Sequence, residues 1–319
     1  MAALGNNFNL LRLAFALMVV AYHLVFLSGV SGWSSAIPLM SELAEIGVEG
    51  FFVLSGYLVY ASLERSASVG LYAEKRFRRL YPAYGAVILV CAAAGLAFSP
   101  EVRADLAAVA RYLGANLVFA NFLEPNLPGI FDGPSNIVPE INGALWTLKI
   151  EVMFYLVLPL LAWLLRKVGP ARWALFGAIY VGAEAWRFGF EGAGQVELSR
   201  QLPGQMSFFI TGMALYRLKL SGPRIHLVGL LGSVLLALTF VRQEAEPVRA
   251  LGLGCLAIWC ATAAPRLPDA ARFGDLSYGL YIVHFPIIQT VAALGIFAWN
   301  PWAGLGAVVL ASIVAALFL

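Results

Sequence analysis

The sequence predicts an all-α protein: one polytopic bundle of about ten transmembrane helices with a cytoplasmic N-terminus. Of the 319 residues, 61% are apolar or aromatic and only 12% are charged, about half the charged share of a soluble domain. Long apolar stretches recur from one end of the chain to the other. Basic residues gather in alternate connections between these stretches.

Ten apolar stretches approach the roughly 17–25 residues that a membrane-spanning helix needs. We expect each of them to form a helix. They lie near residues 8–27, 45–61, 82–98, 146–165, 173–188, 203–218, 225–240, 248–264, 276–296 and 301–319.

The basic residues of the connections predict the orientation of the bundle. Thirteen lie on the side of the N-terminus and the 62–81 connection, and six lie on the opposite side. Cytoplasmic connections carry the excess of Lys and Arg, so the N-terminus, this connection and the C-terminus are expected in the cytoplasm. The larger set is Arg65, Lys75, Arg76, Arg78, Arg79, Arg166, Lys167, Arg172, Arg217, Lys219, Arg224, Arg266 and Arg272.

The longest polar stretch, about residues 100–145, is expected outside the cell as an ordered lid or acceptor-side loop. It is rich in proline and includes a short amphipathic helix near 104–119. No part of it forms a second soluble domain, so we predict one integral-membrane domain over residues 1–319. The apolar run that reaches Leu319 raises the expectation of a longer native C-terminus.

Charged and imidazole side chains inside the predicted spans are the informative residues. Each costs several kcal/mol in a bilayer unless it has a partner or faces water. His23, Glu49 and Glu151 all fall roughly 6–8 Å below the outer surface and can form one layer. The full set is Arg12, His23, Glu49, Lys149, Glu151, Glu184 and His284.

Arg12 and His23 lie 11 residues apart on the first predicted helix. This spacing turns the helix by about 1100°, so the two side chains point within roughly 20° of each other, about 16 Å apart along the axis. Arg12 lies near the inner rim, where Arg76, Arg78 and Arg79 also gather. The protein is therefore polarised, with cations inside and a histidine-carboxylate layer toward the outside.

This polarity suits a substrate with an anionic head in the cytoplasm and chemistry near the outer face. A buried neutral imidazole beside a carboxylate is a general base for a hydroxyl, so His23 with Glu49 or Glu151 is one interpretation. The other is that His23 is a satisfied core or interfacial histidine. Similarly, Arg76 and its neighbours either bind phosphate or only set the topology.

Two further residues have simpler interpretations. Glu184 either joins the outer layer or pairs with Arg187 one turn away. His284 precedes Pro286 in a helix, and we expect a packing or helix-capping hydrogen bond there.

Five blocks of the chain resemble, in order and spacing, the membrane acyltransferases of acyltransferase family 3, which acylate bacterial surface sugars and related acceptors. "LRLAFALMVVAYHL" and "GVEGFFVLSGYLVY" carry Arg12, His23 and Glu49, and Glu49 stands where many members have Asp. "RFRRLYP" carries Arg76 and Arg79. "NGALWTLKIEVMFYLVLP" and "LSYGLYIVHFPI" carry Asn142, Trp146, Glu151, Tyr155, Tyr278 and His284.

The resemblance implies transfer of an acyl group, most often acetyl, from cytoplasmic acyl-CoA to a carbohydrate or glycolipid hydroxyl outside a bacterial inner membrane. Acetyl-CoA would be a co-substrate, with no permanently bound cofactor or metal. His23 would be the general base or a transient acyl carrier, oriented by Glu151 and Glu49. Arg12, Arg76, Arg78 and Arg79 would bind coenzyme A, and Trp146, Asn142 and Tyr155 the acceptor.

A proton-coupled transporter or flippase of glycolipids is the alternative, with the charged layer as a proton relay. The absence of an internal repeat favours the enzyme. The net charge of +3 is spread between loops, which argues against a nucleic-acid partner.

Overall fold

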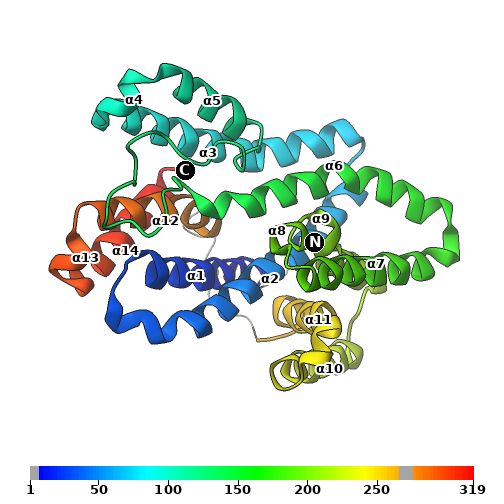
Figure 1. Cartoon of the computed structure of the whole chain (residues 1–319). Coiled ribbons are helices and arrows are strands. Elements are labelled where there is room, and N and C mark those ends of the chain that lie inside the picture. Colours follow the sequence, from blue (N-terminus) through cyan, green and yellow to red (C-terminus); the bar gives the residue numbers. More distant parts are fainter. Residues whose placement is uncertain (1–6, 266–275) are drawn as a thin grey trace. The chain divides into compact units, whose positions relative to one another are not determined.

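The structure, a computed structural model, describes residues 7–265 and 276–319, and these residues form helices without any β-strand (Figure 1). Arg266 and Arg272, two of the predicted cytoplasmic cations, lie outside the described residues. The elements are α1 (Phe8–Leu27), η1 (Ser31–Ala36), α2 (Ile37–Glu64), α3 (Val69–Phe98), α4 (Pro100–Ala104), α5 (Leu106–Leu117), η2 (Gly143–Leu145), α6 (Trp146–Lys167), η3 (Gly169–Ala171), α7 (Arg172–Gly192), α8 (Val196–Ser199), α9 (Leu202–Leu218), α10 (Pro223–Val241), η4 (Gln243–Val248), α11 (Arg249–Thr262), α12 (Leu276–Ala293), α13 (Ile296–Trp299) and α14 (Pro301–Leu317).

Each of the ten predicted segments is helical, which confirms the all-α membrane class. Six described helical segments are long and apolar enough to cross a membrane, so the chain is an integral membrane protein. Ten spans and a cytoplasmic N-terminus stay predictions. The six segments are Phe8–Leu27, Ser31–Glu64, Val69–Phe98, Gly143–Lys167, Pro223–Val241 and Leu276–Ala293.

The 62–81 connection was wrongly expected to be a loop. Helix α2 continues to Glu64 and α3 begins at Val69, so Arg76, Arg78 and Arg79 lie within a helix. Hydropathy alone misses the first turns of α3 because many of the side chains there are polar. Pro82 does not mark the beginning of α3 either, because it lies inside that helix. The amphipathic helix expected near 104–119 is α5, as predicted.

The chain divides into two compact units, which we describe separately. Unit 1 contains Met1–Arg12, Val48–Arg76 and Ile150–Asp269, and unit 2 contains Leu13–Gly47, Phe77–Lys149 and Ala270–Leu319. Helices α1, α2, α3 and α6 each contribute residues to both units. The expectation of one domain over residues 1–319 stays a prediction.

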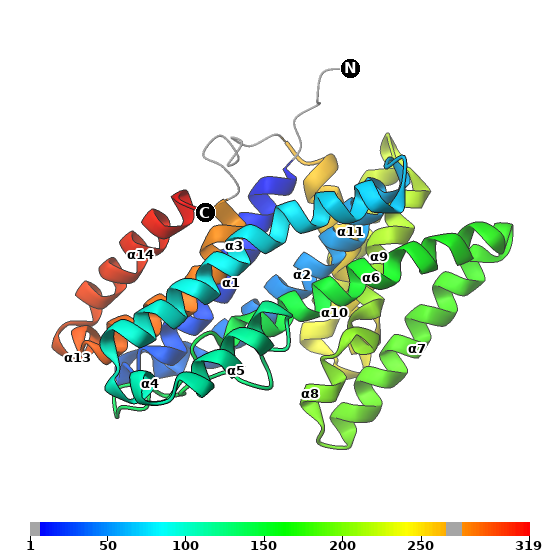
Figure 2. The ribbon, with the colours of Figure 1, turned by 90° about the horizontal axis from the view of Figure 1, so that it is seen from above.

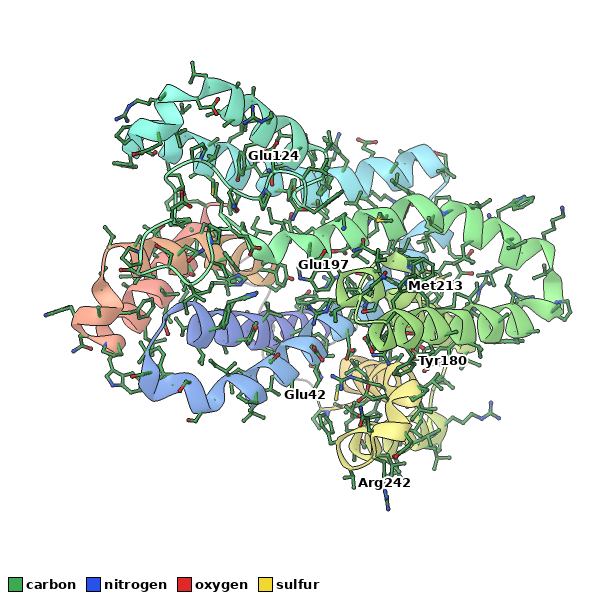
Figure 3. All side chains as sticks on the ribbon, in the orientation of Figure 1. Glu42, Glu124, Tyr180, Glu197, Met213 and Arg242 are labelled. Carbon is green, nitrogen blue, oxygen red and sulfur yellow. The ribbon has the colours of Figure 1, made fainter. Side chains whose placement is uncertain are left out.

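In unit 1, glycines bring helix backbones close together. A Cβ added to Gly56 of α2 would overlap the main chain at Phe209 of α9, and one on Gly212 would overlap the main chain at Val53. The ring of Phe209 stacks on Phe154 of α6, with 3.9 Å between ring centroids. Small residues thus allow close helix contact, which is a main source of stability between helices in lipid. Figure 2 shows the helices from a second direction, and Figure 3 adds the side chains, with Tyr180 marking α7 and Met213 marking α9.

In unit 2, α12 holds the segment that precedes α6. Gln289 is fully buried, and its Nε2 donates to the carbonyls of Val138 and Glu140 at 2.7 and 3.0 Å. Asn136 Nδ2 donates in return to Gln289 Oε1 at 2.9 Å. This stretch without regular structure is therefore ordered by its backbone hydrogen bonds to one helix.

Two prolines inside helices each free a backbone carbonyl, and a side chain satisfies each of them. Pro159 cannot donate to the carbonyl of Tyr155, and the Tyr72 hydroxyl donates to that oxygen at 3.1 Å. Pro286 likewise leaves the carbonyl of Ile282 to Asn142 Nδ2, at 2.8 Å. Such partners are required where no water reaches the backbone.

Candidate functional site

His23 of α1 forms a pair with His284 of α12 in unit 2. Nδ1 of His23 lies 2.8 Å from Nε2 of His284, and the two rings are stacked with centroids 5.0 Å apart. The edge of the Phe285 ring packs on His23 at 5.1 Å. His23 is partly buried, and His284 is fully buried. The pair leaves one nitrogen of His23, Nε2, for other chemistry.

The predicted acceptor residues of unit 2 lie at the start of α6. Asn142 is buried, and its side chain donates to the carbonyl of Ile282 on α12. Ile282 lies two residues before His284. Trp146 is the first residue of α6 and is partly buried. Thr147 shares a 2.7 Å hydrogen bond with the Tyr281 hydroxyl of α12. The start of α6 is thus fastened to the helix that carries His284.

Three predicted site residues come together in unit 1. The carboxylate of Glu151 accepts hydrogen bonds from the hydroxyls of Tyr155 and Ser55, the latter at 2.9 Å. The guanidinium of Arg76 lies 5.9 Å from the centre of the Tyr155 ring and donates to Ser62 Oγ at 3.3 Å. A carboxylate, a phenol and a guanidinium are therefore grouped on α6 and α3.

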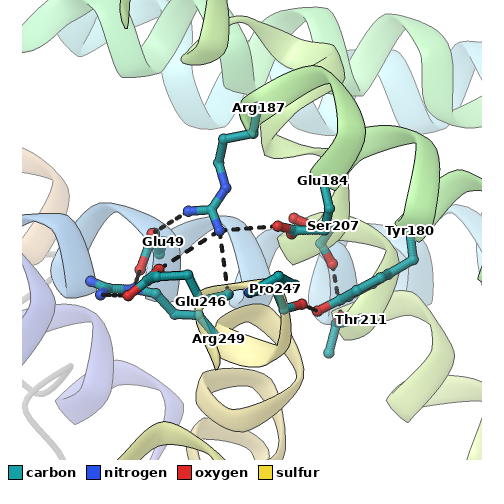
Figure 4. A network of polar contacts seen from close by, with 9 residues as sticks. All are labelled: Glu49, Tyr180, Glu184, Arg187, Ser207, Thr211, Glu246, Pro247 and Arg249. Atoms are coloured by element: carbon teal, nitrogen blue, oxygen red, sulfur yellow. Dashed lines mark hydrogen bonds and ion pairs between the residues drawn. The ribbon is translucent and has the colours of Figure 1, made fainter. Parts of the chain in front are cut away.

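Glu49 lies in a buried ion-pair network of unit 1 (Figure 4). Its Oε2 accepts from Nε of Arg249 at 2.7 Å, and its Oε1 lies 3.9 Å from Arg187. Arg187 also pairs with Glu184 at 3.0 Å, which confirms one of the two sequence interpretations of Glu184. Glu246 pairs with both arginines, at 3.8 and 3.4 Å. The network ties α2, α7 and α11 together.

The remaining predicted donor-binding residues are helical. Arg12 is a partly buried residue of α1 in unit 1, whereas Arg78 and Arg79 are exposed on the part of α3 in unit 2. His23 belongs to unit 2, and Glu49 and Glu151 belong to unit 1. The predicted pairing of His23 with a carboxylate therefore stays a prediction, and so do the roles of the other site residues.

The sequence interpretation missed two partners, His284 for His23 and Arg249 for Glu49. His284 was expected only to pack or cap a helix, although its position inside an apolar helix already required a partner. Arg249 is one of the six basic residues that the sequence interpretation assigned to the connections on the outer side, but its side chain is only 4% exposed. It lies at the outer end of a predicted span, the end nearer to the layer assigned to Glu49, and this shared end could have suggested the pair.

Among the described residues, no group of three or more His, Cys, Asp and Glu side chains could hold a metal ion. The absence of a metal or bound cofactor stays a prediction.

Comparison with known proteins identifies the family. A family model described as an acyltransferase domain, acyltransferase 3, matches residues 6–319. Nodulation protein 10 of Rhizobium leguminosarum bv. viciae is 30% identical over 93% of this chain and 87% of its own length. Peptidoglycan O-acetyltransferase OatA of Listeria monocytogenes is 33% identical over 47% of this chain and 22% of its own.

The O-acetyl transferase of Shigella phage Sf6 is 30% identical over 48% of this chain and 44% of its own length. No solved structure matches the chain. Because the family model covers nearly the whole sequence and the six long apolar helical segments agree with it, the chain belongs to the acyltransferase 3 family and is an integral membrane protein.

Proposed function

We propose that this protein transfers an acyl group, preferably acetyl, from cytoplasmic acyl-CoA to a hydroxyl of a carbohydrate or glycolipid at the outer face of a bacterial inner membrane. The imidazole pair of α1 and α12 is the observation that carries the proposal. An O-acyltransferase needs a base for the acceptor hydroxyl, and His23 offers a ring nitrogen beside the one that His284 engages.

The names of similar proteins support the acceptor class. The Listeria protein is named for O-acetylation of peptidoglycan, and a Rhizobium meliloti protein, 26% identical over 78% of this chain, is named for exopolysaccharide production. Both names point to glycans, and we extend this acceptor class to the present chain.

The charge distribution supports the donor and its side. Arg76, Arg78 and Arg79 lie within one helical turn of α3, and Arg76 is partly buried. Guanidinium groups match phosphate geometry, so we assign these residues and Arg12 to the phosphates of coenzyme A. The excess of cations on the same predicted side supports a donor in the cytoplasm.

In the proposed reaction, Nε2 of His23 takes the proton of the acceptor hydroxyl while its oxygen attacks the thioester carbonyl. The new C–O bond forms, the C–S bond breaks, and the imidazolium returns the proton to the coenzyme A sulfur. The products are an ester and free coenzyme A. Glu151 and Glu49 are proposed to support His23, and Trp146, Asn142 and Tyr155 to border the acceptor.

The test uses the full chain in detergent with acetyl-CoA and a soluble glycan, and it measures released thiol. We expect His23→Ala to abolish thiol release, with coenzyme A affinity from calorimetry nearly unchanged, and Arg76→Ala to weaken that affinity. His226→Ala is the matched control, because His226 is exposed and bonded to Trp259. Full turnover in His23→Ala would refute the role of His23. No coenzyme A binding, together with proton-coupled glycolipid uptake, would support the transporter instead.

Mass spectrometry of surface glycans from cells with and without the protein identifies the acceptor. A loss of acyl groups from one glycan is the expected result. Unchanged glycan acylation in the deleted strain would contradict the proposed acceptor class.

A further inference from the structure

His284 is a buried residue for which the sequence interpretation expected only a packing or helix-capping hydrogen bond. Each of its two ring nitrogens lies within hydrogen-bond distance of a partner in unit 2. Nδ1 lies 3.1 Å from the carbonyl oxygen of Leu280, and Nε2 lies 2.8 Å from Nδ1 of His23. These contacts connect the backbone of α12 to the proposed base through one imidazole.

The two contacts determine where the protons lie. A carbonyl oxygen can only accept, so Nδ1 of His284 carries the proton in its bond to Leu280. A neutral imidazole has one N–H, so Nε2 of His284 is then an acceptor. The atom that faces it, Nδ1 of His23, must therefore donate. Neutral His23 is left with its lone pair on Nε2.

We propose that His284 is a positioning residue that holds His23 in the Nδ1–H tautomer, so that Nε2 is ready to receive the acceptor proton. The inference rests on the proposed function, in which His23 is the base. When Nε2 takes the proton, Nδ1 of His23 still donates to His284, and the bond gains the strength of a charged donor. A neutral ring thus does the orienting that a carboxylate performs in a serine protease triad.

Neighbouring residues hold the His23 and His284 rings in their positions. Phe285, the next residue on α12, packs its ring edge on His23 at 5.1 Å. A Cβ on Gly143 would lie 2.9 Å from the Phe285 ring, so the chain before α6 closes over that ring. Asn142 satisfies the Ile282 carbonyl that Pro286 frees, which fixes α12 beside His284. A neutral orienting group also avoids placing another charge within a membrane helix.

The direct test is ¹⁵N NMR of the full wild-type chain labelled at histidine. The chain has three histidines, and exposed His226 serves as the reference. We expect His23 to show a protonated Nδ1 and an unprotonated, pyridine-like Nε2. A His23 ring protonated at Nε2 would overturn the inference. This measurement needs no turnover, so its result is separate from success or failure of the proposed acyl transfer.

Two substitutions of His284 add a functional readout. His284→Leu keeps the apolar volume but accepts no hydrogen bond, and we expect kcat to fall about 100-fold, with KM for acetyl-CoA unchanged. His284→Gln offers an amide oxygen near the position of Nε2, and we expect it to stay within about tenfold of wild type. Equal losses in both variants, or an unchanged His23 spectrum in His284→Leu, would contradict the positioning role.

Discussion

Replacing Glu49 by Gln tests whether this residue holds unit 1 together. The change removes the carboxylate that pairs with Arg249 at 2.7 Å, in a setting where only 4% of the Arg249 side chain and 10% of the Glu49 side chain are exposed. Breaking a buried pair from one side costs about 3–5 kcal/mol, because the other charge remains buried. Arg249 keeps Glu246 at 3.4 Å, so we expect the lower end, about 3 kcal/mol.

A loss of about 3 kcal/mol lowers Tm by roughly 6–12 °C for a cooperative unit of about 150–250 residues, the size class of unit 1. Thermal unfolding in detergent, followed with a thiol-reactive dye, measures the shift, because the chain has three free and partly buried cysteines. Glu124→Gln is the matched control. Glu124 is 34% exposed and pairs with Arg111 at 3.3 Å, so its loss should cost no more than about 1 kcal/mol.

The double variant Glu49→Leu with Arg249→Met separates charge from packing. We expect it to recover most of the lost Tm, since no unpaired charge remains. A Tm of Glu49→Gln within 2 °C (about 0.5–1 kcal/mol) of wild type would refute the reasoning. A loss of turnover without a loss of Tm would instead support Glu49 as a partner of the base.

Three further predictions concern a close helix contact, a carbonyl freed by a proline and the lowered pKa of Glu101. Gly56→Ala forces α2 from the main chain of α9, so we expect it to lose about 1–3 kcal/mol in thermal unfolding; Gly182→Ala, in open space on α7, should instead be neutral or stabilising by up to about 1 kcal/mol. Tyr72→Phe leaves the carbonyl freed by the proline of α6 without its donor, and should cost about 1–3 kcal/mol by the same measurement. The pKa of the Glu101 carboxyl group is lowered by hydrogen bonds from its own backbone N–H and from the Ser99 hydroxyl. These hydrogen bonds to the charged carboxylate stabilise the folded state at any pH above the ordinary pKa of about 4.3. Their contribution is lost as the pH falls through the lower pKa of the folded state. Melting from pH 7 to pH 3 should therefore depend less on pH in Ser99→Ala, and an equal dependence would contradict the assignment.

The helices could be predicted from the sequence, but their partners could not. Apolar length identified α1 and α6 almost to the residue, because a bilayer imposes that length on any span. The same criterion placed the start of α3 too late, at 82 instead of Val69, because polar helical turns carry no hydropathy pattern.

The candidate site was predictable only in its chemistry. His23 and Glu49 stood out as costly polar residues, yet their partners lie 261 and 200 residues away in the chain. A single sequence contains no distance between such positions, since helices of similar apolarity pack in many orders. The grouping of Glu151, Tyr155 and Arg76 was not expected, because the sequence interpretation placed Glu151 in the outer layer and Arg76 at the inner rim.

Pro286 of α12 makes the His23–His284 pair sensitive to mutations that lie far from either histidine in the chain. Pro286 has no N–H to donate to the Ile282 carbonyl, and Asn142 Nδ2 donates to it instead. One backbone hydrogen bond of the helix that carries His284 is therefore replaced by a side chain from outside that helix. A change in the stretch before α6 thus alters the frame of the imidazole pair without touching either ring. Substitutions in this stretch would therefore impair proton transfer by His23, in addition to any loss of glycan affinity through Asn142.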